Sequence, residues 1–180
     1  QRVLNLMRKR FEISVAERIL RATHEVGIKV TCNFMFGFPG ETEVDFNETL
    51  DFIKRNASNI DIVYPSRSFC VLEDNSYLIE HTEEFGIKPD YTHPLYWESK
   101  DGENIYPERR RRCEVFSRFA DTLGISVGLG LQTSIELDKW FNLGNYYESM
   151  GKIDEAIECY KNYLRLDPEN IEILNRIKNI

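Results

Sequence analysis

The residues best suited to bind a ligand gather in one stretch, Val30 to Thr42, with the sequence VTCNFMFGFPGET. The stretch opens with an apolar run that is too short for a helix and rich in strand-forming residues. Gly37, Pro39 and Gly40 then turn the chain. In α/β proteins ligands bind at the carboxyl ends of parallel strands, which is where we expect this turn to lie. A glycine there lets a ligand approach the backbone without meeting a Cβ atom.

The cysteines and histidines do not have the spacing of a metal site. The four cysteines are far apart in the sequence and form no CxxC pair, and the histidines form no HxxH or HExxH pair. We therefore predict no metal site in this chain. Isolated reduced thiols are typical of a cytoplasmic protein, which is the localisation we expect. The residues concerned are Cys32, Cys70, Cys113, Cys159, His24, His81 and His93.

The charge of the chain bears on its partners. Over 180 residues the formal net charge is -7, and 42% of the residues are hydrophobic. That composition supports a packed core, and the negative charge argues against nucleic acid or an anionic membrane as a partner. No apolar stretch approaches the length of a membrane span. The first residues read as part of a helix and include no initiator methionine, so we interpret the sequence as part of a larger protein.

Helices and strands alternate in the first two thirds of the sequence. A helix is expected from Ser14, which with Glu17 has the pattern of a capping box, and another from Thr42, capped with Asp45. Strands are expected before Gly37 and over residues 60–64. This alternation predicts an α/β fold in which the strands pair in parallel through right-handed crossovers.

The periodicity fades between residues 66 and 106. A short helix is expected over residues 76–85, in a loop that either covers a substrate or covers one edge of the sheet. Another helix begins at Pro107 and ends at Gly124. Its run from Arg109 to Arg112 points to successive sides of the helix, so we expect mostly solvated arginines. Residues 127–133 are expected to form a linker or a last irregular strand.

A second organised segment follows from Leu137 to Asn170. Eight residues stand at the spacing of a tetratricopeptide repeat, which is about 34 residues long. The pattern predicts an antiparallel helical hairpin, followed by a third helix that reaches Ile180. One repeat does not bury its own apolar face, so Ile171, Leu174 and Ile177 are expected to pack on the first domain, on another copy or on further repeats. The eight residues are Trp140, Leu143, Gly144, Tyr147, Gly151, Ala156, Tyr160 and Pro168.

The first part of the chain resembles the later half of a radical S-adenosylmethionine enzyme. The resemblance covers residues 1–126 and rests on QRVLNLMRK at 1–9, GIKV at 27–30 and NFMFGFPGET at 33–42, together with the helix before GIKV. Trp97, Asp101-Gly102 and Arg109 to Arg112 are similar to the end of that catalytic region. Where the family often has Gly-Thr before a helix, this sequence has Asp74-Asn75-Ser76, so the substrate side of that loop departs from the family's pattern.

The resemblance implies a fold and a set of cofactors. It implies the later part of a partial (β/α) barrel over residues 1–130, followed by the all-α repeat and its third helix over 131–180. Members of the family bind S-adenosylmethionine and a 4Fe-4S cluster, which is held by a CxxxCxxC loop that is absent here. The most similar subgroup often carries a cobalamin-binding domain, so cobalamin is implied as a possible further cofactor, and the sequence leaves its use open.

The resemblance also implies cofactor-binding residues. Lys9 matches a basic position that pairs with the carboxylate of S-adenosylmethionine, although a lysine at a helix end is equally common on a protein surface. Asn33 matches a polar position that contacts ribose or adenine, and a polar residue in an apolar buried strand needs a partner. Phe36 and Gly37 match a strand end that binds adenine. No catalytic residue and no metal ligand is implied within this chain.

Two functional hypotheses follow. The first is that the chain is part of a radical S-adenosylmethionine enzyme that methylates, rearranges or cyclises an unknown substrate. Because the cluster-binding loop is absent, we predict that this chain is inactive on its own. The second is a protein-interaction module that works through the tetratricopeptide repeat, with a protein partner or self-association through the third helix.

Overall fold

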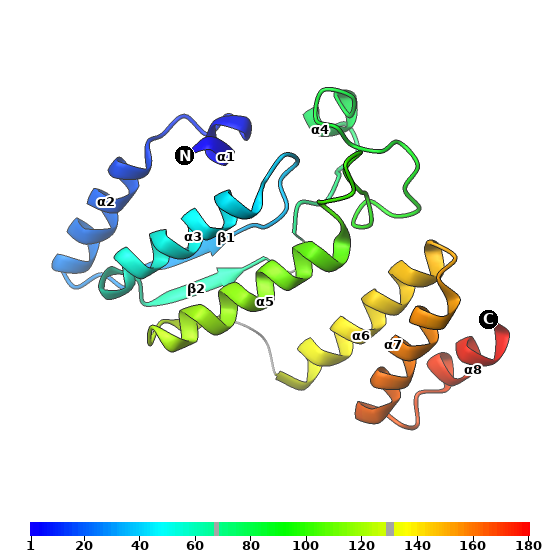
Figure 1. Ribbon diagram of the computed structural model, residues 1–180. Helices are drawn as coiled ribbons and strands as arrows, with labels where there is room; N and C mark the ends of the chain where they lie inside the picture. The colour runs from blue at the N-terminus through cyan, green and yellow to red at the C-terminus, as the bar shows by residue number, and fades with distance from the viewer. Residues whose placement is uncertain (67–68, 129–131) are drawn as a thin grey trace. The chain divides into compact units, whose positions relative to one another are not determined.

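The computed structural model describes residues 1–66, 69–128 and 132–180, except for the side chains of 132–135. The chain divides into two compact units, Gln1–Gly128 and Leu129–Ile180 (Figure 1). The first unit is mixed α/β and the second is helical. Each unit is described by itself below.

The strands of the first unit form one parallel sheet in the order β1-β2-β3. Thr31 pairs with Ile62, and Ile62 in turn pairs with Ser126. The predicted parallel pairing of the two main strands is thus confirmed, whereas the partial barrel stays a prediction, because the described strands form an open sheet. The elements are α1 (Arg2–Leu6), α2 (Ile13–Glu25), β1 (Thr31–Phe34), α3 (Glu43–Arg55), a 3-10 turn η1 (Ala57–Asn59), β2 (Ile62–Pro65), α4 (Tyr77–Glu80), α5 (Tyr106–Thr122) and β3 (Ser126–Val127).

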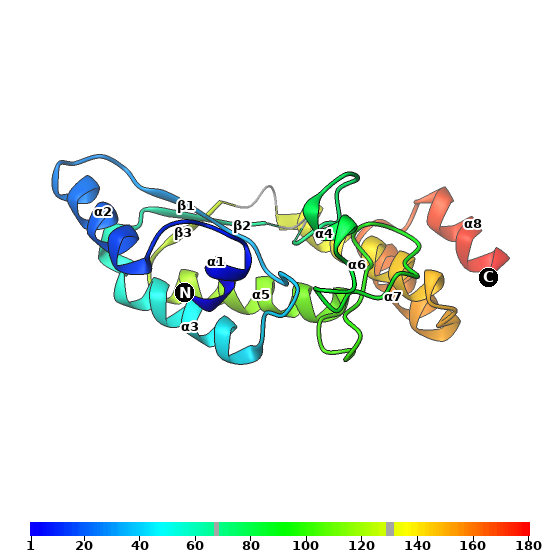
Figure 2. The same ribbon diagram turned by 90° about the horizontal axis from the view of Figure 1, so that it is seen from above.

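Helices α3 and α5 cover one face of this sheet (Figure 2). Phe34 of β1 packs on Phe116 of α5 with ring centroids 4.5 Å apart, and Phe36 packs on the same ring at 5.1 Å. Side chains alternate between the two faces of a strand, so Asn33 and Met35 lie on the other face, where both are exposed. No element of the first unit, as far as the structure describes it, covers that face. A parallel sheet is normally covered on both sides, so this face is unusual.

The two predicted helix starts have different outcomes. The capping box at Thr42 is confirmed, because its Oγ1 accepts the Asp45 N–H and the Asp45 carboxylate accepts the Thr42 N–H at 2.8 Å. The cap at Ser14 is wrong, since α2 begins at Ile13. The Ile13 N–H instead donates to Oε1 of Gln1 at 2.9 Å, so a side chain distant in the sequence satisfies the donor at this helix end.

The expected helix over residues 76–85 is much shorter, because α4 ends at Glu80. Ser76, where the helix is expected to begin, is its N-cap, and its hydroxyl accepts the Ile79 N–H. Beyond it the chain turns inward, and Phe85 and Ile87 join an apolar cluster built on Phe38 and Trp97. Tertiary packing thus replaces the later turns of the predicted helix.

The second unit contains the predicted helical hairpin and third helix: α6 (Gln132–Ser149), α7 (Ile153–Leu166) and α8 (Ile171–Asn179). Gly144 lets α7 approach α6, because a Cβ atom at that position would lie 2.3 Å from Cε1 of Tyr160. Ala156, Tyr160 and Ile173 form the buried core of the unit. Within the described residues, no helix combines the length and apolar character needed to cross a bilayer.

Helix α8 buries part of the apolar face that the sequence left over. Ile173 is 1% exposed, and Ile177 packs against the core of the hairpin, so the expectation that Ile177 needs a partner elsewhere is wrong. Ile171 and Leu174 remain exposed, at 72% and 37%. The hairpin therefore covers one side of α8 and leaves the other side to solvent.

Candidate functional site

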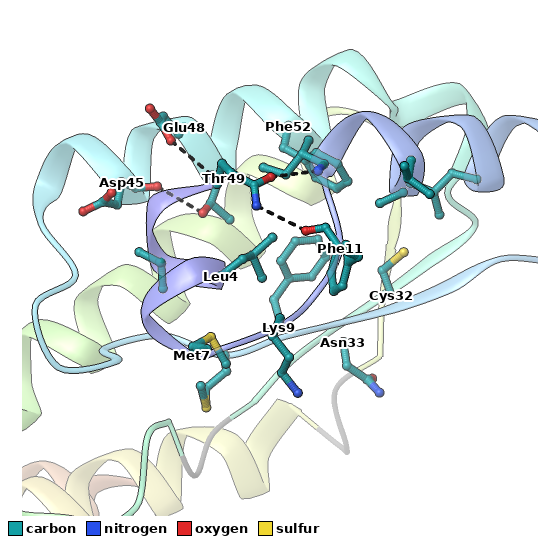
Figure 3. A pocket seen from close by; sticks show the side chains of 18 of the residues that line it. Leu4, Met7, Lys9, Phe11, Cys32, Asn33, Asp45, Glu48, Thr49 and Phe52 are labelled. Atoms are coloured by element: carbon teal, nitrogen blue, oxygen red, sulfur yellow. Dashed lines mark hydrogen bonds and ion pairs between the residues drawn. The ribbon is translucent and has the colours of Figure 1, made fainter. Parts of the chain in front are cut away.

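A cavity of about 790 Å³ lies beside β1 in the first unit (Figure 3). Its walls come from α1, α2, the segment between them, β1 and α3, and they are mostly apolar. None of the residues of α1 and α2, all of which are described, is buried. Their apolar faces instead line the cavity. The labelled lining residues are Leu4, Met7, Lys9, Phe11, Cys32, Asn33, Asp45, Glu48, Thr49 and Phe52.

The cavity follows the free edge of β1. Four consecutive residues, from Cys32 to Met35, line it, although their side chains point to both faces of the sheet. The carbonyls of Val30 and Phe34 accept N–H groups from Ile62 and Ser66 on the β2 side. In a parallel sheet, the backbone N–H and C=O groups of successive residues point alternately to the strands on the two sides. Those of Asn33 therefore point away from β2, toward the cavity. This edge has no strand partner among the residues that the structure describes.

Lys9 and Asn33 both line this cavity. Figure 3 shows both side chains pointing the same way, while Cys32 points from the opposite face of β1 toward α2. Both side chains are exposed, and neither has a hydrogen bond or an ion pair within the described chain. The structure thus brings together two of the four predicted cofactor-binding residues. The expectation that Asn33 is a polar residue in a buried strand is wrong, because its face of the sheet is uncovered.

Phe36 lies outside the cavity. Its side chain is 1% exposed, and its ring packs against Phe46 of α3 with centroids 6.1 Å apart as well as against Phe116. In this position the ring stabilises the contact between the sheet and its two helices. A role for Phe36 in binding adenine stays a prediction, and the geometry gives the ring a packing role.

Gly37 is packed against a side chain. Its φ is +76°, a conformation that favours glycine, and a Cβ atom there would lie 2.1 Å from Cδ of Arg109. Its N–H donates to Oε2 of Glu41 at 2.5 Å, and its carbonyl accepts from Nδ2 of Asn104 at 3.1 Å. The close approach that the glycine permits is therefore filled by Arg109. Contact of a ligand with this backbone stays a prediction.

A buried ion pair closes the turn after β1. Glu41 accepts from Nη1 of Arg112 at 3.0 Å, and each side chain is 5% exposed. Burial raises the pKa of the Glu41 carboxyl, while the N–H of Gly37 and the Arg112 guanidinium act in the opposite direction. Because the Glu41 carboxylate accepts from both the Gly37 N–H and Arg112 of α5, it ties the turn to that helix.

The arginine run of α5 is largely buried, so the expectation of solvated side chains is wrong. Arg109 is 0% exposed, Arg110 7% and Arg112 4%, whereas Arg111 is exposed. Arg109 stacks on the Trp97 ring at 4.3 Å and donates to the carbonyls of Leu95 and Trp97, both at 2.9 Å. The loop before α5 supplies these acceptors, and such long-range partners are not visible in a local charge pattern.

Two arginines anchor the N-terminal segment that carries Lys9. Arg2 forms an ion pair with Asp45 of α3, and its Nε donates to that carboxylate at 2.9 Å. Arg8 lies over the Tyr77 ring at 3.9 Å and has a positive φ of 57°. The tight turn at Arg8 and its contact with Tyr77 position the next residue, Lys9, in the cavity wall.

The cysteines do not converge. Within the described residues, no three side chains of His, Cys, Asp or Glu come together as a potential metal site. Cys32 is half-buried in the cavity wall, and burial raises the pKa of its thiol. Cys32 is not among the site residues predicted from the sequence. Its place beside Asn33, on a strand whose edge is free, is the feature that could have indicated it.

Comparison with known proteins gives a partial picture. The tetratricopeptide repeat family profile matches residues 138–170. The tRNA-2-methylthio-N(6)-dimethylallyladenosine synthase of Buchnera aphidicola subsp. Baizongia pistaciae is 33% identical over 95 residues, which cover 48% of this chain and 21% of that protein. The TPR repeat-containing protein MJ0941 of Methanocaldococcus jannaschii is 36% identical over 50 residues, which cover 28% of this chain and 14% of that protein.

Another similar protein is the N-terminal acetyltransferase A complex auxiliary subunit NAA15 of Arabidopsis thaliana, which is 47% identical over 49 residues, or 27% of this chain and 6% of that protein. The chain thus spans at most about a fifth of the length of these relatives. No solved structure matches. The second unit therefore contains a tetratricopeptide repeat, and the similarity to the tRNA-modifying synthases is short and distant.

Proposed function

We propose that the first unit is part of a radical S-adenosylmethionine enzyme and that its cavity binds this cofactor. The observation that carries the proposal is that Lys9 and Asn33, two polar side chains without partners in the described chain, line the same apolar cavity. The similarity to the tRNA-modifying synthases, which are radical S-adenosylmethionine enzymes, supports it. That match covers more of the chain than the second unit contains, so it includes part of the first.

The residues present fit the cofactor's chemistry. The Lys9 ammonium is a mobile point charge suited to a carboxylate, and the Asn33 amide offers a donor and an acceptor to a ribose or a purine. A cavity of about 790 Å³ lies in the usual range for small-molecule sites. When bound to an iron-sulfur cluster, the cofactor supplies a carbon radical for the reaction. This chain orients the cofactor and shields it from water.

The chain does not fit the iron-sulfur cluster. A 4Fe-4S cluster needs closely grouped thiolates, and no such group exists among the described residues. We propose that the cluster, and cobalamin if it is used, is held by parts of the protein outside this sequence, and that this chain alone is inactive. The free edge of β1 and the uncovered face of the sheet are compatible with further strands of a barrel.

Binding of S-adenosylhomocysteine to the 180-residue chain tests this proposal, with titration calorimetry as the readout. We expect Lys9→Ala to weaken binding about tenfold, because a charge-assisted contact to the carboxylate is lost. Lys29→Ala, which removes another exposed lysine close to β1, is the matched control and leaves binding unchanged. Equal affinity of the Lys9→Ala variant and the wild type would contradict the assignment. A stable 4Fe-4S absorption after anaerobic reconstitution of this chain would contradict the predicted absence of a cluster site.

A second function belongs to the other unit. Its tetratricopeptide repeat supports a role in protein interaction. We propose a second copy of the chain as the partner, which would bury the exposed Ile171 and Leu174 of α8. Light scattering after gel filtration tests this, with Ile171→Glu and Leu174→Glu expected to halve the mass. Asn175→Glu, at another exposed position of the same helix, changes the charge by the same amount and is the matched control. A monomeric wild-type chain would rule out self-association.

A further inference from the structure

A row of three residues crosses the uncovered face of the sheet. Asn33 of β1 pairs in register with Tyr64 of β2. Val63 pairs with Val127, so the next residues, Tyr64 and Gly128, are also neighbours. The Gly128 N–H donates to the carbonyl of Val63 at 2.8 Å, which continues the strand pairing to this point. The row lies at the carboxyl ends of three parallel strands, where ligands bind in α/β proteins.

The Tyr64 ring lies across Gly128. A Cβ atom at Gly128 would be only 2.2 Å from Cε1 of Tyr64 and 2.4 Å from Cζ. The absence of a side chain at Gly128 therefore allows the ring to extend along the row, over the neighbouring strand. The residue is nevertheless 46% exposed, which is unusual for a large aromatic residue in a parallel sheet. The row thus presents an aromatic ring to solvent.

The polar groups of the row are unengaged. The Tyr64 hydroxyl and the Asn33 amide have no hydrogen-bond partner within the described residues. Met35, two residues beyond Asn33 on the same face, is 37% exposed and adds a polarisable apolar surface. Tyr64 and Asn33 are register partners on neighbouring strands, so the row offers a ring for stacking and, one strand away, an amide with a donor and an acceptor, which are the kinds of contact that recognise a nucleobase.

We propose that Tyr64 and Asn33 bind a planar heteroaromatic ring of purine size, with the ring stacked on Tyr64 and its edge hydrogen-bonded to Asn33. Gly128 acts as a positioning residue, because it sets the place of the Tyr64 ring. The inference rests on the proposed function for the source of the ring, which is either the adenosyl group of the cofactor or a base of the substrate. The shared chemistry is the purine.

The experiment measures the binding of adenosine to the full chain by ligand-observed NMR and by calorimetry. Tyr64→Leu is expected to weaken binding about tenfold, because stacking on the aromatic ring is lost. Tyr64→Phe keeps the ring and is expected to stay within about threefold of the wild type. Gly128→Ala leaves the tyrosine in place but displaces its ring, so it is expected to weaken binding as Tyr64→Leu does. Thr31→Ala, an exposed change one pleat away on the same face of β1, serves as the control and leaves binding unchanged.

Two ligands separate this inference from the proposed function. If S-adenosylhomocysteine binding is weakened both by Lys9→Ala and by Tyr64→Leu, the ring belongs to the cofactor. If adenosine binding depends on Tyr64 and S-adenosylhomocysteine binding does not, the ring belongs to a substrate. If S-adenosylhomocysteine binding depends on Lys9 and no ligand depends on Tyr64, the proposed function stands and the stacking site is overturned. If the wild-type chain binds neither adenosine nor S-adenosylhomocysteine, the stacking site is overturned as well.

Discussion

The side chain of Arg109 lies directly against the α-carbon of Gly37, so a residue of α5 occupies the space that a side chain after β1 would need. The contact joins two segments that are distant in the sequence, and the guanidinium beyond it bonds Asn104 and the carbonyl of Trp97. A glycine that reads in the sequence as an opening for a ligand is here a packing partner of a buried arginine.

Gly37→Ala is therefore expected to destabilise the first unit strongly. The new Cβ atom would overlap Cδ of Arg109 and would also occupy a left-handed backbone conformation, at a combined cost of about 3 kcal/mol or more. Gly86→Ala is the matched control, since Gly86 has a φ of +61° but no atom near its Cβ position. That change is expected to cost about 1 kcal/mol, as measured by urea unfolding. Equal losses for the two variants would contradict the role assigned to Arg109.

The ion pair between Arg2 and Asp45 predicts a pH-dependent stability. Burial by itself raises the pKa of Asp45, but hydrogen bonds from Arg2 and Thr42 outweigh it, so the net pKa is well below its ordinary value. The carboxylate thus contributes stability above the pKa of an unfolded aspartate, about 4, and loses it as the pH falls below that.

Asp45→Asn is expected to lower the free energy of unfolding by about 1–3 kcal/mol at pH 7. The difference from the wild type should shrink as the pH falls below about 4, because the unfolded wild-type carboxyl then takes up a proton while the folded one is still ionised, and it is smallest once the folded carboxyl is protonated too. Asp51→Asn, on an exposed position of the same helix, should have little effect at any pH. A difference at Asp45 that did not change with pH would argue against the ion pair.

The contact between Gly144 and Tyr160 predicts a coupled pair of substitutions in the second unit. Gly144→Ala is expected to destabilise this unit by about 2 kcal/mol, because its Cβ atom would meet the Tyr160 ring. Tyr160→Leu removes that ring together with the hydrogen bonds from its hydroxyl to Asn145 and Glu148. If the ring causes the strain, the double variant loses less than the sum of the two single variants. Additive losses in thermal unfolding would contradict this.

Thiol reactivity should distinguish Cys32 from the other cysteines. Cys32 is half-buried in the cavity wall, whereas Cys70, Cys113 and Cys159 are buried. We expect Ellman's reagent to modify one thiol first in the folded chain and that reaction to be absent in Cys32→Ser. Burial raises the pKa of the Cys32 thiol, so its rate should rise with pH into the alkaline range. Burial raises the pKa of Cys70 to about 12, which keeps it unreactive over the same range.

Sequence reasoning succeeded where the determining contacts are local. The capping box at Thr42 depends on Asp45 three residues later, and the small residue at Gly144 belongs to a repeat with a known period. The parallel order of β1 and β2 followed from the alternation of helices and strands. These features are specified by neighbours within one element or by a short connection.

Sequence reasoning failed where the partner is distant in the chain. The buried state of Arg109 and Arg112 depends on Trp97 and on Glu41, and neither is implied by a run of four arginines. The start of α2 depends on Gln1. Of the predicted site residues, Lys9 and Asn33 line one cavity because the segment after α1 and strand β1 both form its wall, an arrangement that their positions in the sequence do not contain.

Helices α2 and α3 have the same length of 13 residues, but α3 buries Phe46 and Ile53 and α2 buries nothing. A helix of that length is only marginally stable by itself in water. The amide protons of α2 should therefore exchange with deuterated solvent well before those of α3, and trypsin should cleave after Arg18 or Arg21 before it reaches Lys54. A molecule that filled the space beneath α2 would slow both exchange and cleavage. Protection of this helix therefore reports occupancy of the cavity without requiring the chain to turn over a substrate.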